Sequence, residues 1–338
     1  MPDGARRAFG RSGGGCLRRI RVRRSGPPAP ASPAPSPKSR AGHQGIRVLL
    51  VNRPLIQGGT MVTPSNRAGS GEPVLLLHGF TLSHHVWHRV VDDLASDFDV
   101  LALTMLGHWG GPRLRIRDLG VRGIADGIER ELDAIGWDTC HISGNSLGGQ
   151  VGFELERRGR ARSLAPINPS GGWKRFSYTE FRLGLGFTLQ YPLAVAARLL
   201  GDRAATREFF QRPVIRNCSR DMSAVSPEDA ADVIRAVSHC PVYMPIQLAF
   251  LRDGPLTGLE NVTVPTSLIL SEFDTFATRE DCMQRLIDEL PDHVEEITLP
   301  GVGHIPMLEN PEIVADALRA HLYKATTDEA HSATSPTG

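Results

Sequence analysis

The run Gly144-Asn145-Ser146-Leu147-Gly148 is the strongest chemical signal in the sequence. It directly follows the apolar run at 140–143 and directly precedes a helical pattern, which predicts a sharp strand-to-helix turn with the hydroxyl of Ser146 exposed above a sheet. The N-terminus of the following helix would favour negative charge developing beside that hydroxyl. A second match to the pattern, at 10–14, has neither a strand before it nor a helix after it, so it is not a candidate.

Two further residues could activate this serine. A serine hydroxyl is a poor nucleophile at neutral pH until a base takes its proton, and an acid must orient that base. His304 immediately follows the last predicted strand, and Asp274 lies three residues past the end of the strand before it. We therefore expect Ser146, Asp274 and His304 to meet at one edge of a sheet.

Four motifs at compatible spacing resemble the α/β-hydrolase fold family. They are HGF at 78–80, GNSLGG at 144–149, LILSEFD at 268–274 and GVGHIPMLENPE at 301–312. The resemblance covers about residues 46–170 and 255–323, and the chain order Ser, Asp, His agrees with it. It implies a serine hydrolase with a helical lid, in which Ser146 is the nucleophile, Asp274 the orienting acid and His304 the base.

The same resemblance implies where a substrate is held. The backbone N–H groups of Phe80 and Leu147 would form the oxyanion hole, and losing one such donor typically costs about 10²- to 10³-fold in rate. Phe80, Trp173 and Phe176 are the expected substrate contacts. Trp173 and Phe176 belong to the segment at 171–254, which is mostly apolar and resembles a lid. The reaction needs no cofactor and no metal.

Several residues compete for these roles. Glu272 could replace Asp274 as the acid, although the family spacing favours Asp274. His84, His85 and His88 could suggest a metal site, but no Cys, Asp or Glu stands at matching spacing, so we expect a solvated helix start. Haloalkane dehalogenases and epoxide hydrolases resemble this core but carry Asp at the nucleophile position, so Ser146 argues against both.

The alternation of short β-rich runs with helical patterns predicts the elements that position these residues. The expected strands are Arg47–Asn52, Pro73–Leu77, Val100–Thr104, Thr139–Ser143, Ser163–Asn168, Thr266–Ser271 and Val294–Leu299. The expected helices are His85–Ser96, Asp118–Ile135, Gly149–Arg158, Arg279–Glu289 and Pro311–Leu322. The fold class is therefore α/β, with a mostly parallel central sheet, helices on both faces and a helical lid insertion.

The domain organisation follows from composition. We expect a disordered basic tail at 1–44, a first part of the core at 45–170, a helical lid at 171–254, a second part of the core at 255–325 and a disordered C-terminal tail at 326–338. Residues 1–44 hold ten Lys or Arg against one Asp, whereas the rest of the chain holds 28 against 36 acidic residues. This tail is interpreted as a targeting segment or an over-extended start, and the acidic body gives no reason to expect a nucleic-acid partner.

Other function classes are excluded by length and composition. The 338 residues are 41% apolar, as in ordinary globular proteins, and five Cys without a CxxC pair suggest neither a disulfide framework nor a zinc ribbon. A reducing, cytoplasmic location is expected. The most apolar stretch, Phe181–Gly201, is interrupted by Arg182, Pro192 and Arg198, so no membrane span is expected.

The function favoured by these residues is hydrolysis of a small apolar ester or lactone through an acyl-enzyme. One alternative is a carbon–carbon bond hydrolase of ring-cleavage products, since GNSLGG followed by NPSGGW resembles that branch. A cofactor-free perhydrolase and a non-catalytic ligand receptor on the same fold are further alternatives. The physiological substrate and the oligomeric state stay open.

Overall fold

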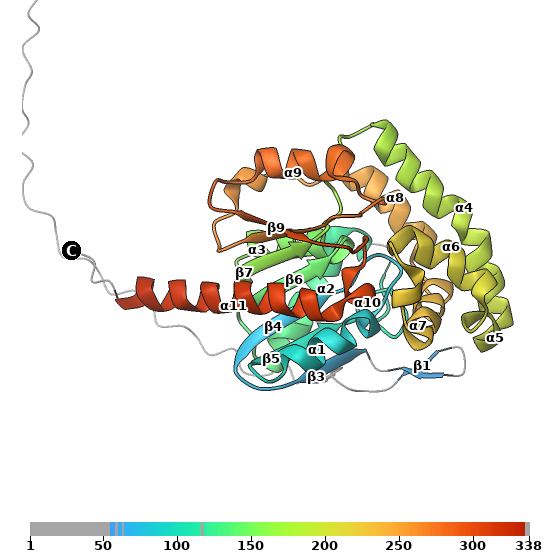
Figure 1. The fold of residues 1–338 in the computed structure, drawn as a ribbon, viewed down its shortest axis with the longest axis horizontal. Coiled ribbons are helices and arrows are strands. Elements are labelled where there is room, and N and C mark those ends of the chain that lie inside the picture. Colours follow the sequence, from blue (N-terminus) through green and yellow to red (C-terminus); the bar gives the residue numbers. More distant parts are fainter. Residues whose placement is uncertain (1–54, 58–59, 63, 116–117, 335–338) are drawn as a thin grey trace, which may run out of the picture. The chain divides into compact units, whose positions relative to one another are not determined.

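The computed structural model describes residues 55–57, 60–62, 64–115 and 118–334, and its centre is a seven-stranded sheet (Figure 1). The strand order is β3-β5-β4-β6-β7-β8-β9, with β3 antiparallel to β5 and all other pairs parallel. The strands are β3 (Ser65–Ala68), β4 (Glu72–Leu77), β5 (Phe98–Leu103), β6 (Cys140–Asn145), β7 (Ala161–Ile167), β8 (Ser267–Ser271) and β9 (Glu295–Leu299). Two short strands, β1 (Leu55–Gln57) and β2 (Thr60–Val62), form a separate antiparallel pair.

Helices cover both faces of this sheet, which explains why its central strands are continuous apolar runs. Helices α1 (His88–Leu94) and α11 (Pro311–Thr334) pack together on one face, and α2 (Val121–Ile135) and α3 (Leu147–Arg157) on the other (Figure 1). Val74, Leu75, Leu76 and Leu77 of β4 are all buried between the two layers. Shorter helices α9 (Gln284–Glu289) and α10 (Pro306–Glu309) follow β8 and β9.

A group of helices follows β7 and lies at the side of the sheet in Figure 1. Its members are α4 (Tyr178–Leu200), α5 (Asp202–Ala205), α6 (Glu208–Cys218), α7 (Pro227–Ser238) and α8 (Tyr243–Asp253), and we call them the helical insertion. Within the described residues, α4 alone is long and apolar enough to qualify as a membrane span by length and composition, with a mean hydropathy of 1.3. Length and composition alone are weak evidence for a span, so this helix does not overturn the expectation that no segment crosses a membrane.

The expected α/β fold with a mostly parallel sheet is confirmed, and six predicted strands lie within two residues of the observed ones. The predicted strand Arg47–Asn52 and the tail at 1–44 lie outside the described residues. The sequence analysis did not identify β3, because the run SNRA is polar. This strand pairs on one side only, with β5, so it needs no apolar sequence.

The expected disorder at 326–338 is wrong for most of that segment. Helix α11 continues through Thr334, well beyond the predicted end at Leu322. Between Leu322 and the end of the helix the sequence has neither Gly nor Pro, and Ala325, Ala330 and Ala333 favour a helix.

Parallel strands end at the same edge of a sheet, and this edge collects the chemically interesting residues. Ser146 directly follows β6, Asp274 follows β8 and His304 follows β9. Gly79 and Phe80 follow β4, the neighbour of β6. In open α/β sheets, ligands bind at the carboxyl ends of the strands, so this edge is where a site is expected.

Candidate active site

Ser146 lies at a strained turn between β6 and α3. Its backbone has φ 53° and ψ −112°, a conformation that non-glycine residues rarely adopt. The turn depends on close backbone approach, because a Cβ on Gly148 would lie 2.3 Å from the carbonyl oxygen of Leu77. The glycine that follows the serine in the motif is therefore required by packing against β4.

Three backbone hydrogen bonds hold Ser146 in this conformation. Its N–H donates to the carbonyl of Ile167 over 3.0 Å, and its carbonyl accepts the N–H groups of Gln150 (3.1 Å) and Ser170 (2.9 Å). Such strained residues cost about 1–3 kcal/mol and persist only when surrounding bonds determine them. The start of α3 and the end of β7 thus fix the position of the serine.

Asp274 and His304 form a buried pair. The Nδ1 atom of His304 lies 2.6 Å from Oδ2 of Asp274, and both side chains are 5% exposed. The other carboxylate oxygen accepts the N–H groups of Phe276 (2.9 Å) and Ala277 (2.8 Å). Because Nδ1 is the donor to this fixed carboxylate, Nε2 is the ring nitrogen left to act as a base.

The structure brings Ser146 and His304 to one small pocket. Both residues line a space of about 50 Å³, together with Gly79, Phe80 and Phe276. The hydroxyl of Ser146 makes no hydrogen bond with another described residue, so the two side chains are neighbours in the pocket without being bonded. Catalytic hydrogen bonds are often long in the absence of substrate and tighten in the complex.

Two asparagines that the sequence analysis did not single out hold the histidine loop. The side-chain amides of Asn145 and Asn168 both donate to the carbonyl of His304, over 2.9 Å and 3.0 Å. The side-chain oxygen of Asn168 also accepts the N–H of Ser271, over 2.8 Å. A signal was present, because Asn145 stands inside the Ser146 motif and Asn168 ends the next strand, but only pairing across the sheet shows their common partner.

The oxyanion-hole donors predicted from sequence are the N–H groups of Phe80 and Leu147. Both residues line the same pocket as Ser146. Neither group has a hydrogen-bond partner among the described residues. Leu147 is the first residue of α3, where backbone N–H groups have no partner within the helix. Both groups are therefore free to donate to a ligand.

His78 fixes the loop that carries Phe80. Its Nδ1 atom lies 2.7 Å from the carbonyl of Gly79, and its Nε2 atom accepts the N–H of Met105 over 3.0 Å. Burial lowers the pKa of His78 well below its usual value, which keeps the ring in the neutral form that these two bonds require. His78 thus holds the loop after β4 to the loop after β5.

An apolar pocket extends from Ser146 beneath the helical insertion. Its volume is about 310 Å³, and Phe80, Trp173 and Phe187 are among the residues that line it. Phe80 lies in ring contact with Phe187, with centroids 4.9 Å apart, so the loop after β4 and helix α4 form one wall. A space of this size is within the range of small-molecule sites.

Phe176 does not line this pocket, which corrects the expectation that it contacts substrate. Its side chain is 86% exposed, and the guanidinium of Arg175 lies 5.1 Å from the ring centroid. The backbone of Phe176 has φ 58°, and this turn before α4 places the ring outside the pocket. The aromatic composition of the segment could not distinguish Phe176 from Trp173, which is buried and lines the pocket.

The competing residues are also placed by the structure. Glu272 is exposed and accepts the N–H of Gly301, whereas Asp274 is the carboxylate on His304. The expectation of a solvated helix start is wrong for His84, which is buried and lies 2.8 Å from the hydroxyl of Thr104. Burial lowers the pKa of His84 to about 3. The described residues contain no group of three metal-ligating side chains.

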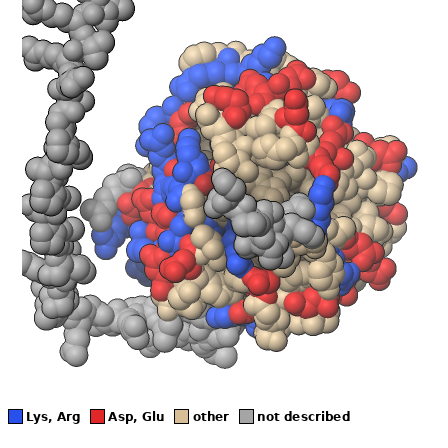
Figure 2. All heavy atoms as spheres, turned by 90° about the vertical axis from the view of Figure 1, so that its left-hand side faces the viewer, with Lys and Arg blue, Asp and Glu red and all other residues tan. Residues whose placement is uncertain are grey.

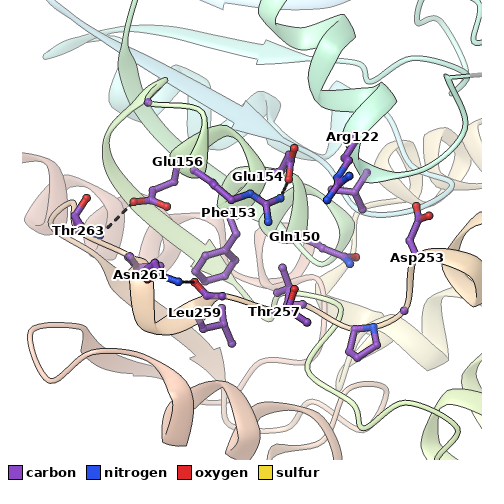
Figure 3. Close-up of a pocket in the computed structure, with 18 of the residues that line it drawn as sticks. Arg122, Gln150, Phe153, Glu154, Glu156, Asp253, Thr257, Leu259, Asn261 and Thr263 are labelled. Atoms are coloured by element: carbon purple, nitrogen blue, oxygen red, sulfur yellow. Dashed lines mark hydrogen bonds and ion pairs between the residues drawn. The ribbon is translucent and has the colours of Figure 1, made fainter.

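A larger cavity of about 1010 Å³ is lined by α3 and by the segment that follows α8, and Ser146 is not among its lining residues (Figure 3). Figure 3 shows Gln150, Phe153 and Glu154 of α3 facing the segment around Thr257 and Asn261. Most of its charged groups already have partners within the fold: Glu154 pairs with Arg157, Arg252 pairs with Asp253, and Glu156 accepts the N–H of Thr263. Size alone therefore does not make this cavity the reaction site.

Comparisons with known proteins identify the family. Residues 74–317 match the sequence model of a family described as the alpha/beta hydrolase family. The chain is 37% identical over 199 residues to the epoxide hydrolase EphH of Mycobacterium tuberculosis, covering 59% of this chain and 93% of that protein. It is 28% identical over 258 residues to a pimeloyl-[acyl-carrier protein] methyl ester esterase of Nitrosospira multiformis, covering 74% of this chain and 95% of that protein.

A solved structure shares the fold. The thermophilic esterase from Thermogutta terrifontis superposes with a TM-score of 0.62 at 21% sequence identity, and the match covers 77% of this chain and 93% of that one.

Proposed function

Because the chain belongs to the alpha/beta hydrolase family, we propose that it is a serine hydrolase that cleaves an apolar carboxylic ester or lactone at Ser146. The observation that carries the proposal is the Asp274–His304 hydrogen bond of 2.6 Å, with His304 and Ser146 lining one pocket. A serine, a histidine and a buried carboxylate that orients the histidine are the parts of a nucleophilic triad.

In the first half of the proposed reaction, Nε2 of His304 takes the hydroxyl proton of Ser146 while Oγ bonds to the carbonyl carbon. The carbonyl electron pair moves onto oxygen, where the free N–H groups of Phe80 and Leu147 can donate to it. The Asp274 carboxylate stabilises the imidazolium that forms. Collapse then breaks the bond to the alkoxy oxygen, which takes the proton from His304.

In the second half, water replaces the alcohol. His304 accepts a proton from the water as its oxygen attacks the acyl carbon, and the same two N–H groups stabilise the second oxyanion. Release of the carboxylic acid returns the proton to Ser146. No step requires a group outside the chain, the substrate and water.

The substrate class follows from the walls beside Ser146. The pocket of about 310 Å³ is lined by aromatic and aliphatic side chains, including Trp173, Phe187 and Met244. The second space that Ser146 lines, which it shares with His304, is only about 50 Å³. This difference in volume favours an ester with one apolar group in the larger pocket and a small group in the smaller space.

Epoxide hydrolysis is the second candidate, because the relative from Mycobacterium tuberculosis carries that name. The chemistry of residue 146 disfavours it. A carboxylate that opens an epoxide forms an ester, which water can cleave, whereas the Ser146 oxygen would form an ether without a carbonyl for water to attack. An epoxide is therefore expected to leave the serine alkylated instead of turning over.

Labelling and turnover together test the proposal. A fluorophosphonate probe should label the wild-type chain and not Ser146→Ala, and a panel of esters of increasing acyl length should be turned over only by the wild type. The panel includes one lactone, one vinylogous diketone and one epoxide. Absence of labelling, or faster turnover of the diketone or the epoxide than of any ester, would contradict the proposal. Ligand binding without turnover of any of these would identify a receptor.

A further inference from the structure

Helix α4 has apolar side chains on two sides, but only one side packs against the fold. On the inner side, the hydroxyl of Tyr243 on α8 donates to the carbonyl of Phe187 over 3.1 Å. On the outer side, Phe181, Leu185, Leu189 and Leu199 recur at helical spacing and are exposed, Leu189 by 70% and Leu199 by 82%. A helix that is apolar all round is normally buried by protein or by lipid.

Helix α8 extends this exposed surface to the mouth of the substrate pocket. Leu248 and Leu251 are exposed, Leu248 by 68%, and both line the pocket of about 310 Å³ together with Phe181 and Leu185. We call these six residues the apolar face: Phe181, Leu185, Leu189, Leu199, Leu248 and Leu251. The pocket that reaches Ser146 therefore opens within the apolar face.

The segment at 174–220, which contains α4 and its apolar residues, is positively charged in an otherwise acidic body. Residues 174–220 include nine Lys or Arg and three Asp or Glu, whereas the rest of the chain from residue 45 holds 19 and 33. Arg198, Arg203 and Arg207 are exposed and make no ion pair with another described residue. On the side away from the helical insertion, Figure 2 shows cationic and anionic side chains intermingled.

We propose that the apolar face docks the protein onto an anionic phospholipid bilayer, with α4 lying in the plane of the interface. Apolar side chains flanked by Lys and Arg are the combination that binds such interfaces, because burial and attraction to anionic headgroups add. The cations do not suit a partner that is itself basic. Helix α4 lies on the bilayer and does not cross it, because its inner side is bonded to α8.

Docking would give an apolar substrate a direct path from the lipid into the pocket, and this consequence alone rests on the proposed function. The docking surface itself is independent of the reaction. Its tests therefore need no turnover, and a failure of either proposal leaves the other intact.

The first test reports contact at the apolar face itself. Full-length Leu189→Trp is mixed with vesicles of phosphatidylcholine and phosphatidylglycerol that carry brominated acyl chains, which quench tryptophan on contact. Thr139→Trp is the matched control, because Thr139 is exposed and precedes β6, at the opposite edge of the sheet from Ser146. Quenching should be stronger for Leu189→Trp, and equal quenching of the two variants overturns the proposal.

The second test separates the apolar face from the basic tail at 1–44, whose ten Lys or Arg are a second source of positive charge. Leu189→Glu with Leu199→Glu should lower the partition coefficient onto phosphatidylglycerol-containing vesicles about tenfold or more, since it removes apolar burial and adds repulsion. Ala134→Glu with Thr139→Glu adds the same charge at exposed positions near the start of β6 and should change binding little. Unchanged binding in the first pair would assign the interaction to the tail and overturn the proposal.

Size-exclusion chromatography without vesicles tests whether a second copy covers the same surface. The wild type and the Leu189→Glu, Leu199→Glu pair should elute alike. A wild-type dimer that this pair converts to a monomer would overturn the proposal, because the apolar face would then be an interface between two copies. Equal thermal unfolding of both glutamate pairs verifies that the comparison is between folded proteins.

Discussion

The carboxyl edge of the sheet and the helical insertion both contribute to the walls around Ser146, but they are held together differently. At the sheet edge, hydrogen bonds fix each chemical group, as when two asparagine amides bind the carbonyl of His304. In the helical insertion, apolar contacts dominate, and α4 leaves one apolar side exposed. Under the two proposals, the chemistry depends on directional bonds in the core, whereas substrate choice and membrane docking depend on apolar surface in the insertion.

This difference predicts that changes at the sheet edge affect rate and changes in the helical insertion affect substrate range. Hydrogen bonds position a reacting atom within tenths of an ångström, and a small displacement of it is costly. Apolar contacts are non-directional, so losing one changes affinity by a modest factor.

The largest effect is expected for Asp274→Asn. The amide cannot hold Nδ1–H of His304 as the carboxylate does, so the wrong tautomer forms and kcat should fall about 10⁴-fold. Glu272→Gln is the matched control, since that carboxylate binds Gly301 on the surface and should leave kcat unchanged. Steady-state turnover of a preferred ester measures both, and an equal loss in the two variants would make Glu272 an acid of the site.

The second-largest effect is expected from acid, because lowering the pH should reduce the free energy of unfolding. Burial lowers the pKa of His78 well below 6.5, of His84 to about 3, and of His108, His141 and His321 to about 4. The unfolded chain binds these protons with a pKa near 6.5, so stability is full above that pH and falls as pH drops toward 4.

Unfolding temperatures between about pH 7 and 5 isolate this effect, because carboxylates titrate mainly below that range. A flat profile over this range would show that the buried histidines gain protons without unfolding the core.

Removing one of the two asparagine side chains that donate to the carbonyl of His304 should lower both the free energy of unfolding and kcat. Asn168→Ala removes the donor to His304 and the acceptor of the Ser271 N–H, and leaving buried partners unsatisfied costs about 1–3 kcal/mol. Denaturant unfolding measures the loss, and kcat should fall while KM stays close to wild type. If KM changed and kcat did not, Asn168 would be a substrate contact and not a positioning residue.

A smaller effect, confined to substrate range, is expected for Gly184→Leu on α4. Gly184 lines the pocket of about 310 Å³ and has open space where a Cβ would stand, so leucine there should partly fill the pocket. kcat/KM for long acyl esters should fall about tenfold, with acetyl esters unchanged. Gly186→Leu also enters open space but does not line the pocket, and it should leave both unchanged.

The smallest effect is expected for Phe176→Ser. The ring is exposed and lies outside the pocket, so KM should stay close to that of the wild type. The free energy of unfolding should change by less than about 0.5 kcal/mol. A several-fold rise in KM for a soluble ester would show that this segment closes over the substrate.

Much of the fold could be predicted because buried parallel strands need continuous apolar sequence. The runs that became β4, β5 and β8 are largely apolar and buried, whereas β9 is an edge strand with the sequence EEITL and is mostly exposed. The polar edge strand β3 was missed because pairing on one side imposes no such requirement. The extension of α11 was missed because a polar helix and a polar coil have similar composition.

The sequence by itself determined which residues can do chemistry. The glycines around Ser146 are required by backbone approach, and Asp274 and His304 follow strand ends, so each position can be derived from local sequence. Only the tertiary structure decided which side chains meet: Asn145 and Asn168 on one carbonyl, Trp173 in the pocket and Phe176 outside it. Local pattern reports what a residue can do, whereas its neighbours depend on how distant strands and helices pack, and the sequence does not encode that packing locally.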